Sequence, residues 1–382
     1  MNKNNITHLK NKLAGLVCLF TVFGCSTHTA QSNNKSINKG GVSASLAPVK
    51  TSNTLLESAS LFASLPDYCP TPDAFAVSPS GELTLSCVNY ANKGLQAGVL
   101  VNINNDKTFT KIAQLSGPNN KGKGRPMGLA YAPDGALFVA DNQGAGKARL
   151  LKLTLKNNKV INTQIVAKGM SSPNGVRYQN GYIYVTQLRV PSKNKAETLS
   201  GIYRFKATDT NILVTNSTDD PHLLFLAKTA NKQRKFGLDG LVFDSQGNLF
   251  VTNLGDDLIY KLTFDTNNNL LSQSTYATLP KGSGPDGLTI DPQGNLYAAG
   301  FLTNQVIRID TNQNVTVIAS YPDNNSENGE LDQPADIIYY KGSLLMSNFD
   351  LLTGPGITNT GHGKPYTVSE IKLHNNRHCS DL

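Results

Sequence analysis

The chain has 382 residues and a formal net charge of +8, with 35 Lys and Arg against 27 Asp and Glu. Its length is ample for one large core. The basic residues are scattered over loops, such as 121–125 and 232–235, rather than gathered on a helix or interleaved with aromatic residues. This scatter favours solvated loops and argues against nucleic-acid binding.

The N-terminus has the pattern of an export signal. Three lysines precede an apolar run over residues 13–23, which is too short for a stable membrane-spanning helix. The run ends in Val22-Phe23-Gly24-Cys25, which resembles the lipobox of bacterial lipoproteins. The resemblance implies that residues 1–25 are a lipoprotein signal peptide and that Cys25 is lipidated. The alternative is an ordinary secreted protein that is cut near Ala30.

The resemblance also implies an address and an anchor. Ser26, rather than Asp, follows the cysteine, which implies the outer membrane of a bacterial cell envelope, with the protein facing the periplasm. Residues 26–52 are rich in Ser, Asn, Lys and Thr and are expected to form a disordered tether. Residues 53–382 are left for the folded domain.

A short phrase returns six times along the rest of the chain: a turn, an apolar strand, a tight turn and a second apolar strand. One copy reads Pro285-Asp-Gly-Leu-Thr-Ile-Asp-Pro-Gln-Gly-Asn-Leu-Tyr-Ala-Ala. The second residues of the copies stand at 73, 127, 174, 239, 286 and 335, so the steps are 54, 47, 65, 47 and 49 residues. These steps match one four-stranded propeller blade with its loops. A β-sandwich is disfavoured because the copies recur at nearly constant spacing.

The sequence therefore predicts an all-β fold, a six-bladed β-propeller of four-stranded antiparallel blades. The last blade offers only three strands, near 335–340, 343–346 and 366–373. The segment 57–65 resembles the outer strands that precede the later phrases. We expect this N-terminal strand to complete the last blade, which closes the ring and removes a sheet edge.

The first strand of each blade lines the central channel, and polar residues stand at its entrance in blades one, three, four and five. The six second residues of the phrases should ring one mouth: Asp73, Met127, Asn174, Asp239, Asp286 and Ala335, with Asp336 beside the last. Nearby carboxylates repel one another, and a hard divalent cation offsets that repulsion. No Cys and His cluster has the spacing of a zinc site. The alternative is that Asp, Asn and Gly simply make tight turns here.

The phrases resemble the SMP-30/gluconolactonase/LRE-like family of six-bladed calcium propellers over roughly residues 55–375. The second blade also resembles strictosidine-synthase-like and NHL-type propellers. By the family pattern, Ca²⁺ would be held by Asp73, Asn174 and Asp239. Met127 stands where the family has an Asn, and Asp286 is an additional acid.

The resemblance implies a calcium-dependent hydrolase of a lactone or a similar small ester, in which Asp239 or Asp286 accepts a proton from water. The expected substrate contacts at the mouth are Met127, Asn253, Asn348 and His362. Two alternatives stay open. One is a non-catalytic envelope propeller that binds a small ligand or a protein partner at this mouth, and the other is a structural envelope protein.

The cysteines of the folded region predict one disulfide. Cys69 and Cys87 are expected at the same mouth of the first blade and would pair in an oxidising compartment, which leaves Cys379 unpaired. A bridge between Cys69 and Cys379, stapling the two chain ends, is the alternative.

Overall fold

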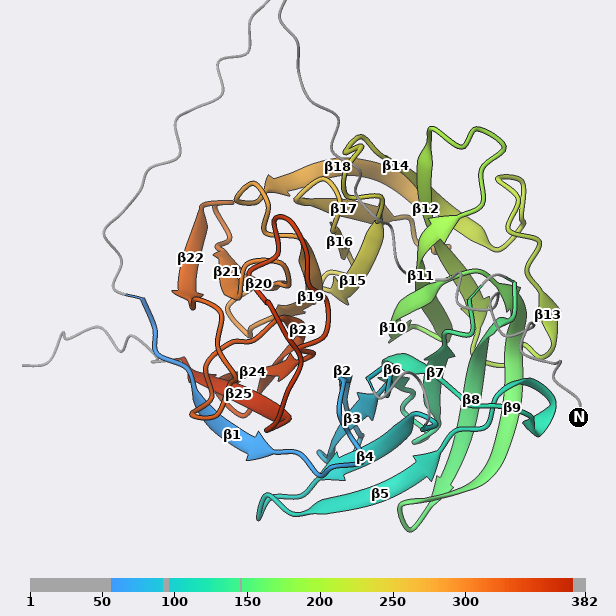
Figure 1. Ribbon diagram of the computed structural model, residues 1–382. Coiled ribbons are helices and arrows are strands. Elements are labelled where there is room, and N and C mark those ends of the chain that lie inside the picture. The colour runs from blue at the N-terminus through green and yellow to red at the C-terminus, as the bar shows by residue number, and fades with distance from the viewer. Residues whose placement is uncertain (1–55, 92–95, 145, 374–382) are drawn as a thin grey trace, which may run out of the picture. The chain divides into compact units, whose positions relative to one another are not determined.

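The computed structural model describes residues 56–91, 96–144 and 146–373. The expected signal peptide with Cys25, the tether and Cys379 lie outside these residues. The described strands form six sheets around a central axis (Figure 1), so the chain folds as the predicted six-bladed β-propeller. Within the part of the chain that the structure describes, no helical segment has the length and hydropathy needed to span a lipid bilayer.

The first three blades are built from residues 72–229. Blade 1 contains β2 (Pro72–Val77), β3 (Leu83–Cys87), β4 (Val99–Ile103) and β5 (Phe109–Gln114). Blade 2 contains β6 (Pro126–Tyr131), β7 (Leu137–Asp141), β8 (Ala148–Lys156) and β9 (Lys159–Met170). Blade 3 contains β10 (Pro173–Gln179), β11 (Tyr182–Val190), β12 (Thr198–Lys206) and β14 (Leu223–Thr229). A short 3-10 helix, η2 (Pro118–Asn120), lies between blades 1 and 2.

One extra strand explains the longest step of the repeat. The connection between β12 and β14 carries β13 (Ile212–Leu213), which pairs in parallel with β9 and adds a fifth, outer strand to blade 2. This excursion, together with the nine-residue strands β11 and β12, lengthens blade 3 without altering its four-stranded sheet.

The last three blades repeat the pattern and close the ring. Blade 4 contains β15 (Leu238–Phe243), β16 (Leu249–Asn253), β17 (Leu258–Phe264) and β18 (Leu270–Thr278). Blade 5 contains β19 (Pro285–Ile290), β20 (Leu296–Gly300), β21 (Gln305–Ile309) and β22 (Val315–Ser320). Blade 6 contains β23 (Pro334–Tyr340), β24 (Ser343–Asn348), β25 (Thr367–Lys372) and the N-terminal β1 (Ser60–Ser64). Because β1 pairs antiparallel with β25, the predicted closure by the N-terminal strand is confirmed.

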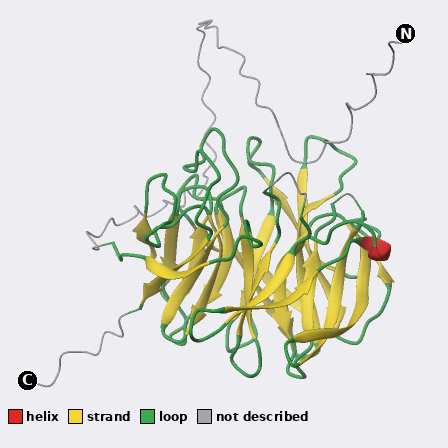
Figure 2. Cartoon of the chain, turned by 60° about the horizontal axis from the view of Figure 1, so that its bottom comes forward, coloured by secondary structure: helices red, strands yellow, loops and turns green. Residues whose placement is uncertain are grey.

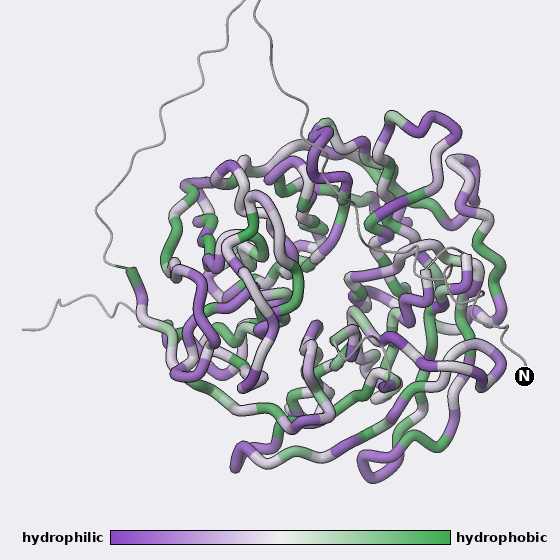
Figure 3. Tube along the Cα trace, viewed as in Figure 1, coloured by the Kyte–Doolittle hydropathy of each residue, from purple (hydrophilic) through white to green (hydrophobic). Residues whose placement is uncertain are grey.

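The tight turn between the first two strands of a blade is fixed by its own side chains. In blade 5, one carboxylate oxygen of Asp291 accepts the N–H groups of Gln293 at 2.9 Å and Asn295 at 2.8 Å. Gly294 supplies the positive φ of +87° that the turn requires. Loops and turns gather at the two ends of the strands (Figure 2), and apolar stretches follow the strands between them (Figure 3).

Close contact between inner strands explains the glycine of the phrase. A Cβ on Gly240 would lie 2.4 Å from the backbone oxygen of Asp286 in the next blade, and one on Gly175 would lie 2.6 Å from that of Asp239. Hydroxyl groups bond the same two oxygens: Thr186 Oγ1 donates to Asp239 O at 2.7 Å and Thr252 Oγ1 to Asp286 O at 2.8 Å. Blades 3 and 4 therefore each fix the backbone at the entrance of the inner strand of the next blade.

Candidate functional site

Four carboxyl groups from four different blades face one another at one mouth. They are Asp73 of blade 1, Asp239 of blade 4, Asp286 of blade 5 and Asp336 of blade 6; after burial, the charges of neighbouring ring acids raise the pKa values of Asp73, Asp239 and Asp286. Asp286 is half-buried and the other three are buried. The structure thus brings together the three expected acids and adds Asp336.

A backbone irregularity turns these side chains into the channel. In blade 5, Pro285 pairs with Gly300, but the next paired residue of the strand is Leu288, so the ladder is interrupted at Asp286 and Gly287. The same shift occurs at the start of the inner strand in blades 1 to 4. Such bulges re-aim a side chain that regular pairing would direct against the neighbouring blade.

Burial makes the four acids hold their protons tightly. Burial is the largest cause of the raised pKa of Asp239, which is about 7; the Asp336 charge raises it further, while a hydrogen bond with the Asp286 side chain lowers it. Burial and then the Asp239 charge raise the pKa of Asp286 well above its ordinary value. At neutral pH the mouth therefore retains protons on some of its carboxyl groups, which is the arrangement expected of acids that exchange protons with a substrate.

Arg177 bridges the channel beside the acids. It extends from β10 of blade 3, and its Nη2 atom donates to the backbone oxygen of Leu288 in blade 5 at 3.4 Å. Its charge partly offsets the effect of burial on the pKa of Asp336, which remains raised. The sequence holds a signal for this residue that the prediction did not use, because Arg177 is the only charged residue at the fifth position of the six phrases.

The donor atoms of this mouth fit a hard cation. Asp73 Oδ2 is buried and has no hydrogen-bond partner, while Asn174, also buried, offers an amide oxygen from blade 3. Carboxylate and amide oxygens are the ligands that Ca²⁺ takes. Across the described residues, no three His, Cys, Asp or Glu side chains are grouped to hold a metal ion. A cation here would therefore depend on two carboxylates and the Asn174 amide, the set that the sequence predicts.

An apolar wall covers one side of the mouth. Met127, Phe301 and Phe349 belong to one buried cluster, and the rings of Phe301 and Phe349 lie 5.8 Å apart in an edge contact. Both phenylalanines directly follow the second strand of their blades. Such a wall removes water from the acids below it, and it offers contact to an apolar part of a substrate.

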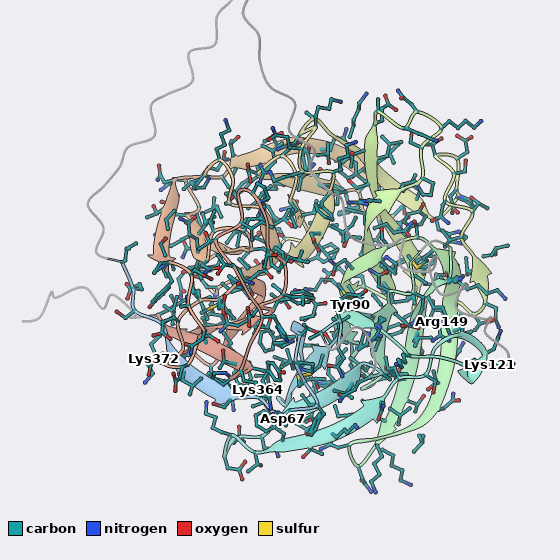
Figure 4. All side chains as sticks on the ribbon, viewed as in Figure 1. Asp67, Tyr90, Lys121, Arg149, Lys364 and Lys372 are labelled. Carbon is teal, nitrogen blue, oxygen red and sulfur yellow. A yellow bond between two sulfur atoms is a disulfide. The ribbon has the colours of Figure 1, made fainter. Side chains whose placement is uncertain are left out.

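Tyr90 is a polar group at this wall that the sequence did not single out. It is labelled in Figure 4, near the centre of the ring, and it packs against the cluster that contains Met127. Burial raises its pKa to about 12, and the charge of Asp73 contributes to the shift. Its hydroxyl therefore stays protonated and is able to donate a hydrogen bond to a carbonyl oxygen.

The two expected asparagine contacts are buried and make hydrogen bonds within the protein. Asn348 Nδ2 donates to Thr367 Oγ1 at 2.7 Å and to Ser369 Oγ at 2.8 Å, inside blade 6. Asn253 is fully buried, and its Oδ1 atom accepts the Asp256 N–H at 3.2 Å. Their contact with a substrate stays a prediction.

His362 is partly buried and makes contacts within the protein. The side chain of His362 is 22% exposed; its Nδ1 atom contacts the backbone oxygen of Asp350 and its ring stacks on Tyr366 at 5.7 Å.

Cys69 and Cys87 form a disulfide with a Cα–Cα distance of 5.0 Å, which ties the segment before β2 to the end of β3. Nearby, Lys364 pairs with Asp67 at 2.5 Å (Figure 4).

Comparison with known proteins gives one family and several similar structures. The family model described as the SMP-30/Gluconolactonase/LRE-like region matches residues 110–327, and no curated protein matches the chain. A luciferin-regenerating enzyme is 14% identical with a TM-score of 0.55, over 84% of this chain and 96% of that one. The calcium-binding protein regucalcin from Agrobacterium tumefaciens has the same identity and TM-score, over 84% and 95%.

A gluconolactonase from Xanthomonas campestris is 14% identical with a TM-score of 0.50, over 85% of this chain and 99% of that one. At these identities the similarity to solved structures supports the fold alone.

Proposed function

The chain belongs to the SMP-30/Gluconolactonase/LRE-like family, and from that premise we propose that it is a calcium-dependent hydrolase of a lactone or a similar small ester. The observation that carries the proposal is the ring of four acids, in which Asp73 has a buried oxygen without a partner. The names of two similar structures, a gluconolactonase and a calcium-binding protein, support both halves of the proposal.

The residues divide into those that hold the cation and those that handle the proton. Asp73, Asn174 and Asp239 would hold a calcium ion, which when bound supplies Lewis-acid polarisation of the ester carbonyl. Asp286 would accept the proton of the attacking water. Its raised pKa makes it, once ionised, a stronger base than an ordinary carboxylate.

The wall of the mouth would orient the substrate. Met127, Phe301 and Phe349 would contact an apolar ring or chain, because they form one buried cluster beside the acids. Tyr90, whose hydroxyl remains protonated, would donate a hydrogen bond to an oxygen of the ester. Removal of water by this wall strengthens every charge interaction at the reacting group.

One observation favours a second candidate function. Met127 stands where the family has an Asn, and a thioether does not bind a hard cation. A propeller that binds a small ligand or a protein partner at the same mouth, without hydrolysis, would keep the acid ring and tolerate this methionine.

A hydrolysis experiment separates the two. Proton release from a panel of lactones and simple esters would be followed in a pH-stat, with buffered calcium and with a chelator, for the wild type and for Asp239→Asn. We expect turnover that needs calcium and falls at least about a hundredfold in the variant. Asp134→Asn, in an exposed hairpin turn, serves as the matched control. No turnover of any substrate, with calcium bound, would leave the ligand-binding function.

We also propose that the protein is lipid-anchored in a bacterial cell envelope, at the outer membrane facing the periplasm. The sequence around Cys25 and the polar stretch that follows it support this. Cys25→Ser is expected to abolish labelling by a palmitate analogue and to release the protein from the membrane fraction. Wild-type protein that carries no lipid and fractionates as soluble would refute the anchor.

A further inference from the structure

Two loops above blade 6 enclose a second group of acids, separate from the ring at the mouth. The loop between β22 and β23 carries Asp323 and Asp332, and the loop between β24 and β25 carries Asp350 and Asn359. The second loop also reaches blade 5, where the Thr358 N–H donates to the backbone oxygen of Leu302 at 2.8 Å. Loop contacts therefore hold these residues at the junction of two blades.

The carboxylate of Asp332 is buried, and no hydrogen bond offsets the cost of its burial. Its exposure is 0%, and neither of its carboxylate oxygens has a hydrogen-bond partner. The charges that act on it are those of Asp350 and Asp323, both negative. An isolated buried carboxylate costs several kcal/mol, so a group with two unpartnered oxygens must either hold a proton or contact a positive ligand.

Neighbouring side chains supply further oxygen atoms. Asp350 is 9% exposed, and its Oδ2 atom accepts the Gly363 N–H at 2.9 Å and lies 3.6 Å from His362 Nδ1. Asn359 is 2% exposed; its side chain hydrogen-bonds Asp350, which lowers the pKa of that carboxyl, and its Oδ1 atom accepts the Gly361 N–H at 3.0 Å. A carbonyl oxygen has a second lone pair, so Asn359 is able to bind a cation without losing this bond.

A proton alone does not satisfy Asp332. Protonation would remove the charge, but the new O–H would lack an acceptor and the other oxygen would still lack a donor. A cation contacts both oxygens at once, as bidentate carboxylates do with calcium. Two carboxylates would balance a divalent charge, and the oxygen-only donor set excludes the softer metals that prefer Cys and His.

We propose that Asp332, Asp350 and Asn359 bind a divalent hard cation of the calcium class, at a site distinct from the mouth. Since no three acidic, His or Cys side chains of the described ranges are grouped to hold a metal ion, the remaining ligands are neutral oxygens. The inference does not rest on the proposed function.

The site would fix one wall of the mouth. The loop that supplies Asp350 and Asn359 begins at Phe349 of the apolar wall and also carries His362. A cation that joins this loop to Asp332 on the preceding one would hold the wall against the channel. The cation's role here is structural, because it would join two loops and because the charges that act on Asp332 are those of Asp350 and Asp323, not those of the ring acids.

Counting bound ions tests the site and keeps it apart from the mouth. The metal-free full chain would be dialysed against calcium, and bound calcium measured by mass spectrometry. We expect two ions per chain for the wild type, one for Asp239→Asn, one for Asp332→Asn and two for the control Glu327→Gln, an exposed residue of the same loop. Asp350→Asn serves as a second variant if Asp332→Asn does not fold.

Hydrogen exchange of the peptide over 350–363 gives an independent readout. At a hundredfold excess over Kd, calcium should slow its exchange by up to about a hundredfold in the wild type and in Asp239→Asn, but not in Asp332→Asn. Wild-type stoichiometry in Asp332→Asn, or exchange that is unaffected by calcium, would overturn the proposal. If the wild type binds one ion and Asp239→Asn alone removes it, the second site is overturned and the mouth site stands. If the wild type binds one ion and Asp332→Asn alone removes it, the second site stands and the mouth site is overturned.

Discussion

Replacing Asp239 by Asn is expected to stabilise the calcium-free protein, and to do so more as the pH rises. Burial raises the pKa of Asp239 from 3.8 to about 7, so the folded protein holds this proton more tightly than the unfolded chain does. The stability that such a group contributes is fully present below about pH 4 and is lost as the pH rises through about 7. Asn carries no charge at any pH and avoids that loss.

The size of the pKa shift of Asp239 sets the size of the stability gain. A shift from 3.8 to about 7 corresponds to a gain in the free energy of unfolding of about 4 kcal/mol at pH 8 and about 1 kcal/mol at pH 4.5. In a domain of this size, about 4 kcal/mol raises the melting temperature by about 8 °C. The gain in unfolding free energy should therefore be larger at pH 8 than at pH 4.5, because it comes from the charge on Asp239.

Scanning calorimetry in a chelator at pH 4.5 and pH 8 measures this gain. Asp134→Asn, in an exposed turn, should melt like the wild type at both. In the Asp332→Asn background, which leaves the mouth as the single proposed calcium site, calcium at a hundred times Kd should stabilise the protein by about 2.7 kcal/mol, and adding Asp239→Asn should remove almost all of this gain. A variant that gains equally at both pH values, or that loses stability at pH 8 in the chelator, would refute the account of the buried charge.

Three further variants test separate parts of the structure. Asp286→Asn should keep the calcium-induced rise in melting temperature but lower kcat by about a hundredfold or more; equal turnover at every pH would exclude this residue as the proton acceptor. Met127→Asn, which restores the amide found in the family, should raise kcat/KM for lactones while costing about 2 kcal/mol of stability, since Met127 is buried; lower turnover with intact calcium binding would contradict it. The double variant Cys69→Ser/Cys87→Ser should cost about 3 kcal/mol, because the disulfide closes a short loop of the unfolded chain; unchanged unfolding in urea, with and without reductant, would show that the bridge does not stabilise the fold.

The repeated phrase was sufficient to predict the fold. Its glycine is needed where inner strands meet, as at Gly240, and its turn residues make the hairpin, as at Gly294. The missing strand of the last blade pointed to the segment that contains β1. These features are local in the sequence, so the architecture could be predicted before any contact was known.

Much of the site depends on where side chains reach, which the phrase does not encode. Asp336 occupies the third position, where four of the other five blades have Gly, so alignment by the second position placed Ala335 in the ring and Asp336 only beside it. Arg177 acts two blades away, at Leu288, because its side chain is long. Asn348 ends a second strand as predicted, but its amide turns into blade 6.

Diffraction from crystals grown with terbium in place of calcium tests the central claim, that the mouth holds a hard cation. An anomalous difference map would locate each ion directly. We predict a peak within ligand distance of Asp73, Asn174 and Asp239, and its loss in Asp239→Asn. A map that shows terbium elsewhere on the chain but no peak at these three residues would contradict the cation site and the hydrolysis that depends on it.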